Sequence, residues 1–309
     1  MSETVSELLR GAIATRVTGV VAELGVADAL AAGPRPVADL AREVGADADV
    51  LERFLRALAS SGVFAETAPG VYGNTETSEL LGRNQPWGAF AQLYGGVWHG
   101  TAGRLDASGR RAFQGDFWAW LAAHPHERSL FDLAMEEGTE RRVDRLDGVA
   151  WNGNETVVDV GGGNGSLLRG LIVRRPELHG VVFDLAETVR DEAALARAGV
   201  AFEAGSFFER VPVADVYVLG TVLHNWPDEQ ATSILRTIRA HAPSSARVLI
   251  LELVVRPADE SASVAWFGLL GLALFGARER TEAEWCALLE AAGLRVDAVH
   301  DALIEASCP

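Results

Sequence analysis

The chain has 309 residues, 49% of them hydrophobic, which is enough for a large buried core and for two domains. Its net charge of −16 disfavours nucleic-acid partners, because binding a phosphate backbone needs clustered cationic side chains, and its lack of lysine excludes Schiff-base, pyridoxal-phosphate and P-loop chemistry. The N-terminus lacks an apolar signal-peptide core and the longest apolar run, Trp266 to Gly276, is much shorter than the roughly 20 residues of a membrane span, so we expect a soluble, cytoplasmic protein without a membrane partner.

The first hundred residues are expected to form a mainly α-helical domain. Between Ser6 and Ser60, apolar residues recur at spacings of three and four, which predicts three or more helices. The stretch GVFAETAPGVYGNTETSELL then predicts two strands joined at Pro69 and Gly70, so residues 1–100 resemble a winged helix-turn-helix. Such domains usually read DNA, but residues 36–82 hold eight acids and three arginines, a balance that repels a duplex. We therefore favour dimerisation or scaffolding over DNA binding.

After Trp151 the pattern changes to alternating strands and helices. The predicted strands are Thr156–Val160, Gly180–Asp184, Ala201–Glu203, Val216–Leu219 and Val248–Leu253. Helical stretches such as Asp228–His241 separate them, and the segment LRVDAVHDALIEAS predicts a β-hairpin at the sheet edge. This alternation is typical of a parallel, doubly wound sheet. Residues 101–309 are therefore expected to form an α/β domain.

A glycine-rich turn follows the first of these strands, in the segment VVDVGGGNGSLL. The pattern from Asp159 to Gly165 is acid-x-G-x-G-x-G and departs from a dinucleotide fingerprint. Asp184 ends the next strand, where a carboxylate can accept both hydroxyls of an unphosphorylated ribose. Ligands of doubly wound sheets bind at these strand ends, so the two features favour S-adenosylmethionine over NAD. For the glycines alone, a tight turn without a ligand is the alternative.

Five segments, in order, resemble the plant-type and bacterial small-molecule O-methyltransferases. The segments are VVDVGGGNGSLL, GVVFDL, FEAGSFFERVPVADVYVLGTVLHNWPDEQATSILR, RVLILELVV and GARERTEAEWCALLEAAG. The N-terminal LGVADALAAGPRPVADLAREVGADADVLERFLRALASSGVF is similar to the dimerisation domain of that family. The resemblance covers nearly the whole chain. It implies a winged-helix domain that pairs two subunits into a homodimer, and a Rossmann-like class I methyltransferase domain that binds S-adenosylmethionine without a metal.

The resemblance also implies a catalytic group. The family's general base is the histidine of an LHxW segment, matched here by His224, and its two flanking acids are matched by Glu252 and Glu279. Chemistry agrees, because a phenol of pKa about 10 is only about 0.1% ionised at pH 7 and needs a base to become a methyl acceptor. A carboxylate on the other ring nitrogen would fix the tautomer and stabilise the imidazolium. A structural histidine at a strand end is the alternative.

The remaining expected site residues follow from the same resemblance. The expected cofactor-binding residues are Asp159, Gly161, Gly163, Asp184, Leu185, Ser206, Phe207 and Gly220. The expected acceptor-binding residues are Phe131, Met135, Asn225, Trp266 and Leu270. At Ser206, Gly220 and Asn225 the chain departs from the family, which usually carries an acid, a basic residue and an acid there. These departures weaken the expected contacts with the adenine and the carboxylate of the cofactor.

Two functions of different classes follow. The first is an O-methyltransferase that acts on a phenolic or polyketide-like hydroxyl, in secondary metabolism. The second is a methyltransferase fold repurposed as a non-methylating enzyme, or as a winged-helix ligand sensor or scaffold. The acidic wing and the presence of all three residues of the expected catalytic set favour the methyltransferase.

Overall fold

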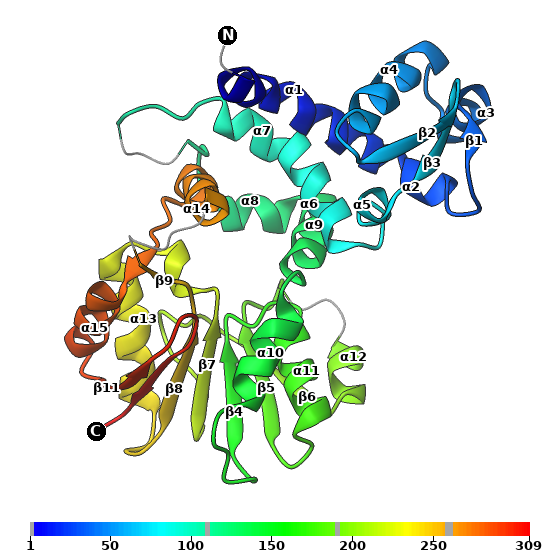
Figure 1. The fold of residues 1–309 in the computed structure, drawn as a ribbon. Helices are drawn as coiled ribbons and strands as arrows, with labels where there is room; N and C mark the ends of the chain where they lie inside the picture. The colour runs from blue at the N-terminus through cyan, green and yellow to red at the C-terminus, as the bar shows by residue number, and fades with distance from the viewer. Residues whose placement is uncertain (1–2, 109–111, 189–191, 257–261) are drawn as a thin grey trace. The chain divides into compact units, whose positions relative to one another are not determined.

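The computed structural model of the protein describes residues 3–108, 112–188, 192–256 and 262–309 (Figure 1). The chain forms two compact units. The first unit contains Met1–Arg104 and Ala123–Glu137, and the second contains Leu105–Ala122 and Gly138–Pro309. The assignment of domains to residues 1–100 and 101–309 stays a prediction.

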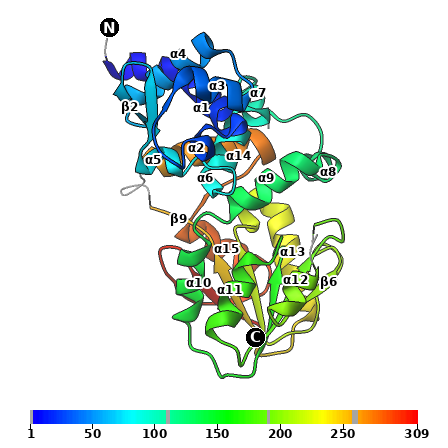
Figure 2. The ribbon, with the colours of Figure 1, turned by 90° about the vertical axis from the view of Figure 1, so that its right-hand side faces the viewer.

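Four helices and a small sheet begin the first unit, and they gather around one core (Figures 1 and 2). The elements are α1 (Glu3–Leu24), α2 (Val26–Ala29), β1 (Arg35–Pro36), α3 (Val37–Val44), α4 (Ala48–Ala59), β2 (Phe64–Ala68) and β3 (Val71–Asn74). Asp47 caps α4 by accepting the N–H of Val50 at 3.0 Å, which satisfies a helix-end donor. The antiparallel pair β2 and β3 is the predicted wing, and β1 adds a third strand in the order β1-β3-β2. The predicted winged-helix fold is confirmed.

Further helices complete the first unit and lead into the second. They are α5 (Glu76–Glu79), α6 (Pro86–Gly95), α7 (Val97–Ala102), α8 (Phe117–Ala123) and α9 (Pro125–Met135). Helices α1 and α6 cross with almost no side chain between them, because Gly19 and Gly95 meet at the crossing: a Cβ added at Gly19 would lie 2.8 Å from the Cα of Gly95. In the part of the chain that the structure describes, no helix has the length and apolar character needed to cross a bilayer.

A seven-stranded sheet organises the second unit, in the order β11-β12-β8-β7-β4-β5-β6. The strands are β4 (Thr156–Val160), β5 (His179–Asp184), β6 (Val200–Ala204), β7 (Val216–Gly220), β8 (Arg247–Leu251), β11 (Arg295–Val299) and β12 (Ile304–Ser307). The five strands from β4 to β8 run parallel, and the hairpin β11–β12 joins β8 in antiparallel orientation. The predicted sheet and edge hairpin are confirmed, but the strand predicted over Val248–Leu253 stops at Leu251, so Glu252 lies just beyond it.

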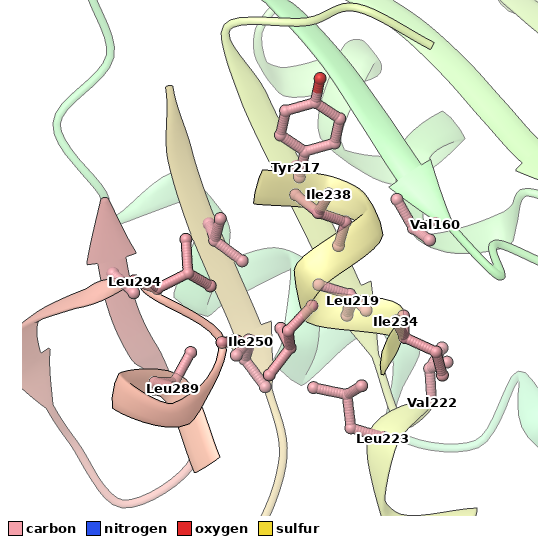
Figure 3. Close-up of a cluster of buried hydrophobic side chains, with 14 of the residues drawn as sticks. Val160, Tyr217, Leu219, Val222, Leu223, Ile234, Ile238, Ile250, Leu289 and Leu294 are labelled. Atoms are coloured by element: carbon pink, nitrogen blue, oxygen red, sulfur yellow. The ribbon is translucent and has the colours of Figure 1, made fainter. Parts of the chain in front are cut away.

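Helices cover both faces of this sheet (Figure 1). One face packs against α10 (Thr139–Asp147), α11 (Ser166–Arg174) and α12 (Glu192–Arg197), and the other against α13 (Asp228–His241) and α15 (Glu282–Ala291). On the second face, Ile234 and Ile238 of α13 and Leu289 of α15 pack with Leu219 and Ile250 of the sheet (Figure 3). Their burial, about 1.5 to 3 kcal/mol for each large aliphatic side chain, anchors the strand ends that carry the site.

The direction of strand addition reverses at β4, which pairs with β5 on one side and β7 on the other. In open α/β sheets, ligands bind beyond the carboxyl ends of the strands at such a switch point. Here those ends lead to the Gly161 turn, to Asp184 and to the segment after Gly220. The expected cofactor-binding and catalytic residues lie at this edge of the sheet.

Candidate active site

The turn from β4 into α11 requires glycine for two separate reasons. Gly161 and Gly165 have φ angles of 73° and 75°, in the left-handed region that favours glycine. A Cβ at Gly165 would also come within 2.5 Å of the Leu195 side chain. The turn is tied to β5 because the N–H of Gly161 donates to the carbonyl of Phe183 at 2.8 Å. The turn is therefore a rigid, bare stretch of backbone.

Two carboxylates lie under and beside this turn. Asp159 is 2% exposed, and its Oδ2 has no hydrogen-bond partner among the described residues. Burial, reinforced by the nearby charge of Asp184 and opposed by Arg142, raises the pKa of Asp159 to about 7. The Oδ2 of Asp184 accepts the N–H of Gly163 at 2.9 Å, and its Oδ1 accepts the N–H of Leu185 at 2.7 Å. Two acids at neighbouring strand ends make a site suited to cationic and hydroxyl-bearing ligands.

The other expected cofactor-binding residues lie at or just beyond the strand ends on the same edge of the sheet. Leu185, at the end of β5, is 41% exposed, and the Oγ of Ser206 accepts the N–H of Phe208 at 3.3 Å. The ring of Phe207 packs edge-on against Trp226, 6.0 Å away. At Gly220 a Cβ would lie 2.9 Å from the Cδ2 of Leu167, so a side chain at this position requires Leu167 to shift. Contact of these residues with a cofactor stays a prediction.

The structure brings the three expected catalytic residues together. His224 lies in the short 3-10 turn η1 (Leu223–Asn225), with a side chain 16% exposed. Its Nδ1 is 3.2 Å from Oε2 of Glu252 and 3.4 Å from Oε1 of Glu279. Both carboxylates therefore approach Nδ1. The other ring nitrogen, Nε2, is left for another group.

These carboxylates set the protonation of the histidine. Burial disfavours the imidazolium and by itself lowers the pKa of His224, but the charge and close contact of Glu252 and the charge of Glu279 outweigh it. Arg280 opposes them, and the balance raises the pKa to about 9. The imidazole is thus a much stronger base than an ordinary histidine of pKa about 6.5.

Backbone strain and a carboxylate shape the turn that carries His224. Thr221 has a φ of 58°, which is an outlier for a β-branched residue and is common only at functional or strained sites. The Oε1 of Glu252 accepts the N–H groups of Leu223 and His224 at 2.8 and 3.3 Å. Asn225 donates from Nδ2 to the carbonyl of Thr221 at 3.2 Å, which closes the turn. Glu252 therefore holds the backbone of His224 with one oxygen and contacts its ring with the other.

The burial of one residue of the site has no signal in the sequence. Arg280, in the two-residue strand β10 (Arg280–Thr281), is 0% exposed and donates to the carbonyls of Leu223 and Trp226 at 3.1 and 2.7 Å. An arginine after Glu279 looks like a surface residue in the sequence, because nothing local indicates burial. The preceding acid was the only feature that pointed to this segment.

The expected acceptor-binding residues are divided between the two units. Phe131 and Met135 belong to α9 of the first unit, where Phe131 is buried and Met135 is half-buried. Trp266 and Leu270 belong to α14 (Ala262–Phe275) of the second unit, where Trp266 is 61% exposed. Asn225 lies beside His224 as described above. Their contact with an acceptor stays a prediction.

Comparison with known proteins identifies the family. The family model of the O-methyltransferase domain matches residues 94–295, and that of the O-methyltransferase dimerisation domain matches residues 6–84. The chain is 34% identical to a phenazine O-methyltransferase of Lysobacter antibioticus, over 97% of this chain and 92% of that protein. It is 37% identical to the 2,7-dihydroxy-5-methyl-1-naphthoate 7-O-methyltransferase of Streptomyces carzinostaticus, over 91% of this chain and 89% of that protein.

A solved structure gives the same result. An O-methyltransferase from neocarzinostatin biosynthesis, in complex with S-adenosyl-L-homocysteine and 1,4-dihydroxy-2-naphthoic acid, superposes with a TM-score of 0.81 at 32% identity and covers 96% of each chain. The chain belongs to the O-methyltransferase family. It is an S-adenosylmethionine-dependent O-methyltransferase of the class I fold.

The residues present fit this cofactor. The buried Oδ2 of Asp159 lacks a partner among the described residues, and a cationic ligand such as a sulfonium amino acid supplies the charge that an ionised Asp159 needs. No atom lies within 4 Å of the position that a Cβ at Gly163 would take, so the turn leaves open space beside Asp184. Asp159 and Asp184 would therefore hold the cofactor at its cationic and ribose ends. When bound, S-adenosylmethionine supplies an electrophilic methyl group on a positively charged sulfur.

Proposed function

We propose that this enzyme methylates a phenolic hydroxyl of an aromatic or polyketide-like small molecule in secondary metabolism, and that His224 removes the hydroxyl proton. The observation that carries the proposal is the placement of Glu252 and Glu279 on Nδ1 of His224, 3.2 and 3.4 Å away. That arrangement leaves Nε2 for the acceptor and supports a positive charge on the ring after proton transfer.

The raised basicity of His224 suits a phenol. The pKa of a phenolic acceptor, about 10, exceeds that of an ordinary histidine by about 3.5 units. Direct proton transfer from the phenol to such a histidine therefore costs about 5 kcal/mol. With the pKa of His224 raised to about 9, the mismatch falls to about one unit in the fraction of the enzyme whose imidazole is neutral, and that fraction grows as the pH rises toward 9. Glu252 and Glu279 thus contribute by matching base to acceptor. The approach of the acceptor oxygen to His224 then depends on positioning by the pocket walls.

The relatives support the acceptor class. Their names specify a phenazine, a dihydroxy-methyl-naphthoate and a 3-amino-4-hydroxybenzoate as the molecules that they methylate. All three are flat aromatic molecules. We infer the same chemical class for this enzyme, acting as a homodimer through the dimerisation domain that spans residues 6–84.

Product analysis tests this proposal. The protein is incubated with S-adenosylmethionine carrying a deuterated methyl group and with hydroxynaphthoates, hydroxybenzoates and hydroxyphenazines, and products are identified by mass spectrometry. We expect at least one acceptor to gain one labelled methyl group on oxygen. Matched analogues that carry a methoxy group in place of the hydroxyl are the control. Cofactor binding by calorimetry without methylation of any hydroxyaromatic would contradict the proposal and favour a repurposed or sensing fold.

A further inference from the structure

Arg280 combines complete burial with a full set of partners. Besides the two carbonyls at Leu223 and Trp226, its Nε donates to Oδ1 of Asp228 at 3.0 Å. Its guanidinium carbon lies 5.0 Å from the centre of the Trp285 ring, within cation–π range. A buried arginine is costly unless every donor finds a partner, and breaking such a set is strongly destabilising. The packing around β10 therefore holds the guanidinium cation of Arg280 against the backbone of the His224 turn.

The polar backbone groups of that turn are bound from two directions. Glu252 accepts the N–H groups of Leu223 and His224, while Arg280 donates to the carbonyls of Leu223 and Trp226. The backbone N–H of Arg278 donates to the carbonyl of His224 at 2.9 Å. Strand β10 pairs in parallel with β9 (Val254–Val255), with Arg280 opposite Val254. Arg280 thus links three segments: the His224 turn, the exit of β8 that carries Glu252, and the segment that carries Glu279.

We propose that Arg280 is a positioning residue of the methyl-transfer site, which holds the turn of His224 in register with Glu252 and Glu279. This inference rests on the proposed role of His224. Lysine cannot replace arginine here, because an ammonium is a point charge whereas the planar fork reaches two carbonyls and a carboxylate at once. A variant that keeps the charge but loses the fork therefore separates positioning from electrostatics.

The charge of Arg280 has a second effect on His224. The charged groups that face the ring or its turn are Glu252 after β8, Glu279 and Arg280 at β10, and Asp228 at the start of α13. Among them, Arg280 opposes protonation of the ring, and Asp228 partly neutralises Arg280. Loss of the cation should therefore make the histidine more basic, whereas loss of packing alone should not.

The test uses Arg280→Lys and Arg280→Met, with Arg295→Met as the control. Arg295 is an exposed arginine of β11 whose side chain pairs with Asp297, which is none of the groups that face His224 or its turn. The ring of His224 is titrated by nitrogen NMR in the complex with S-adenosylhomocysteine, and its signals are assigned by their loss in His224→Asn. Methyl-transfer rates are measured at saturating cofactor.

We expect Arg280→Met to raise the pKa of His224, and Arg280→Lys to leave the pKa near that of the wild type while lowering kcat by about 10- to 100-fold with little change in the acceptor KM. Arg295→Met should change neither. A wild-type kcat in Arg280→Lys would overturn the proposal, as would an unmoved His224 titration in a folded Arg280→Met. If Arg280→Met does not fold, Arg280→Lys still decides. The NMR arm needs no acceptor, so failure of the proposed function and failure of this inference give different results.

Discussion

The carboxylate of Asp159 is buried where the folded protein alone does little to stabilise its negative charge. The side chain is almost completely buried at the end of the central strand, and its pKa is raised by burial and by Asp184 to about 7. A carboxyl group with a raised pKa favours its protonated form in the folded protein. Its ionisation therefore lowers the free energy of unfolding. A strongly raised pKa at the end of a strand is typical of residues that act at functional sites, such as those that bind a charged partner. We therefore propose that Asp159 serves cofactor binding and not stability.

Replacing Asp159 with Asn should stabilise the cofactor-free protein. The pKa of this group is raised from 3.8 to about 7, so the unfolding free energy that it contributes falls as pH rises from about 4 to about 7 and stays low above that range. We expect Asp159→Asn to gain about 1 to 3 kcal/mol at pH 8 and little at pH 4. Urea unfolding at the two pH values measures the difference. An equal effect at both would contradict the assignment, and cofactor affinity should fall in the same variant.

The pH dependence of turnover should report the carboxylates beside His224. With a pKa of about 9, the imidazole is mostly protonated at pH 7, so the methyl-transfer rate should rise with pH until the ring is neutral. Glu252→Gln removes the strongest charge that raises this pKa, so the acid limb of the variant's pH–rate profile should move to lower pH. Glu229→Gln, an exposed acid on α13, is the control. A pH–rate profile shared by wild type and Glu252→Gln would contradict the role given to Glu252.

At the scale of elements, the crossing of α1 and α6 depends on Gly19. A Cβ at this position would lie 2.8 Å from both the carbonyl of Ala91 and the Cα of Gly95, and neither backbone atom can give way cheaply. We expect Gly19→Ala to destabilise the first unit by about 1 to 3 kcal/mol, as overpacking does. Gly11→Ala lies on the same helix with nothing within 4 Å, and it should be neutral or stabilising by up to about 1 kcal/mol. Thermal unfolding of both variants gives the comparison, and equal effects would refute it.

Elements with strong local patterns could be predicted from the sequence, whereas long-range contacts could not. Strand β4 and helix α13 have the predicted bounds, because a buried strand and an amphipathic helix are defined by their own residues. The strand at Val248–Leu253 was predicted too long: Glu252 leaves the sheet to bind a turn nearly 30 residues upstream. Arg280 was missed because its partners at Leu223 and Trp226 are more than 50 residues away. The site is thus completed by contacts that no local pattern indicates.

At the scale of the whole molecule, the surface of α1 predicts a second subunit. Val5, Leu9 and Ile13 recur at a spacing of four on one face of the helix and are 50%, 73% and 71% exposed. An exposed apolar stripe on a domain of the dimerisation family is expected to be covered by another copy. We expect a dimer by light scattering at micromolar concentration. Leu9→Glu with Ile13→Glu should give monomers, while Val213→Glu, at a 70% exposed position of the second unit, should not. A wild-type monomer would contradict this expectation.

The central claim is that His224, supported by Glu252 and Glu279, takes the acceptor proton. Single-turnover methylation at saturating cofactor tests it most directly, with wild type compared with His224→Ala at pH 8 on the acceptor found by product analysis. Calorimetry with S-adenosylhomocysteine should show nearly equal affinity in the two proteins, because the expected cofactor contacts lie on other loops. We predict that His224→Ala transfers the methyl group about 10² to 10⁴ times more slowly, the range of a general base. A His224→Ala enzyme that runs at the wild-type rate would contradict it.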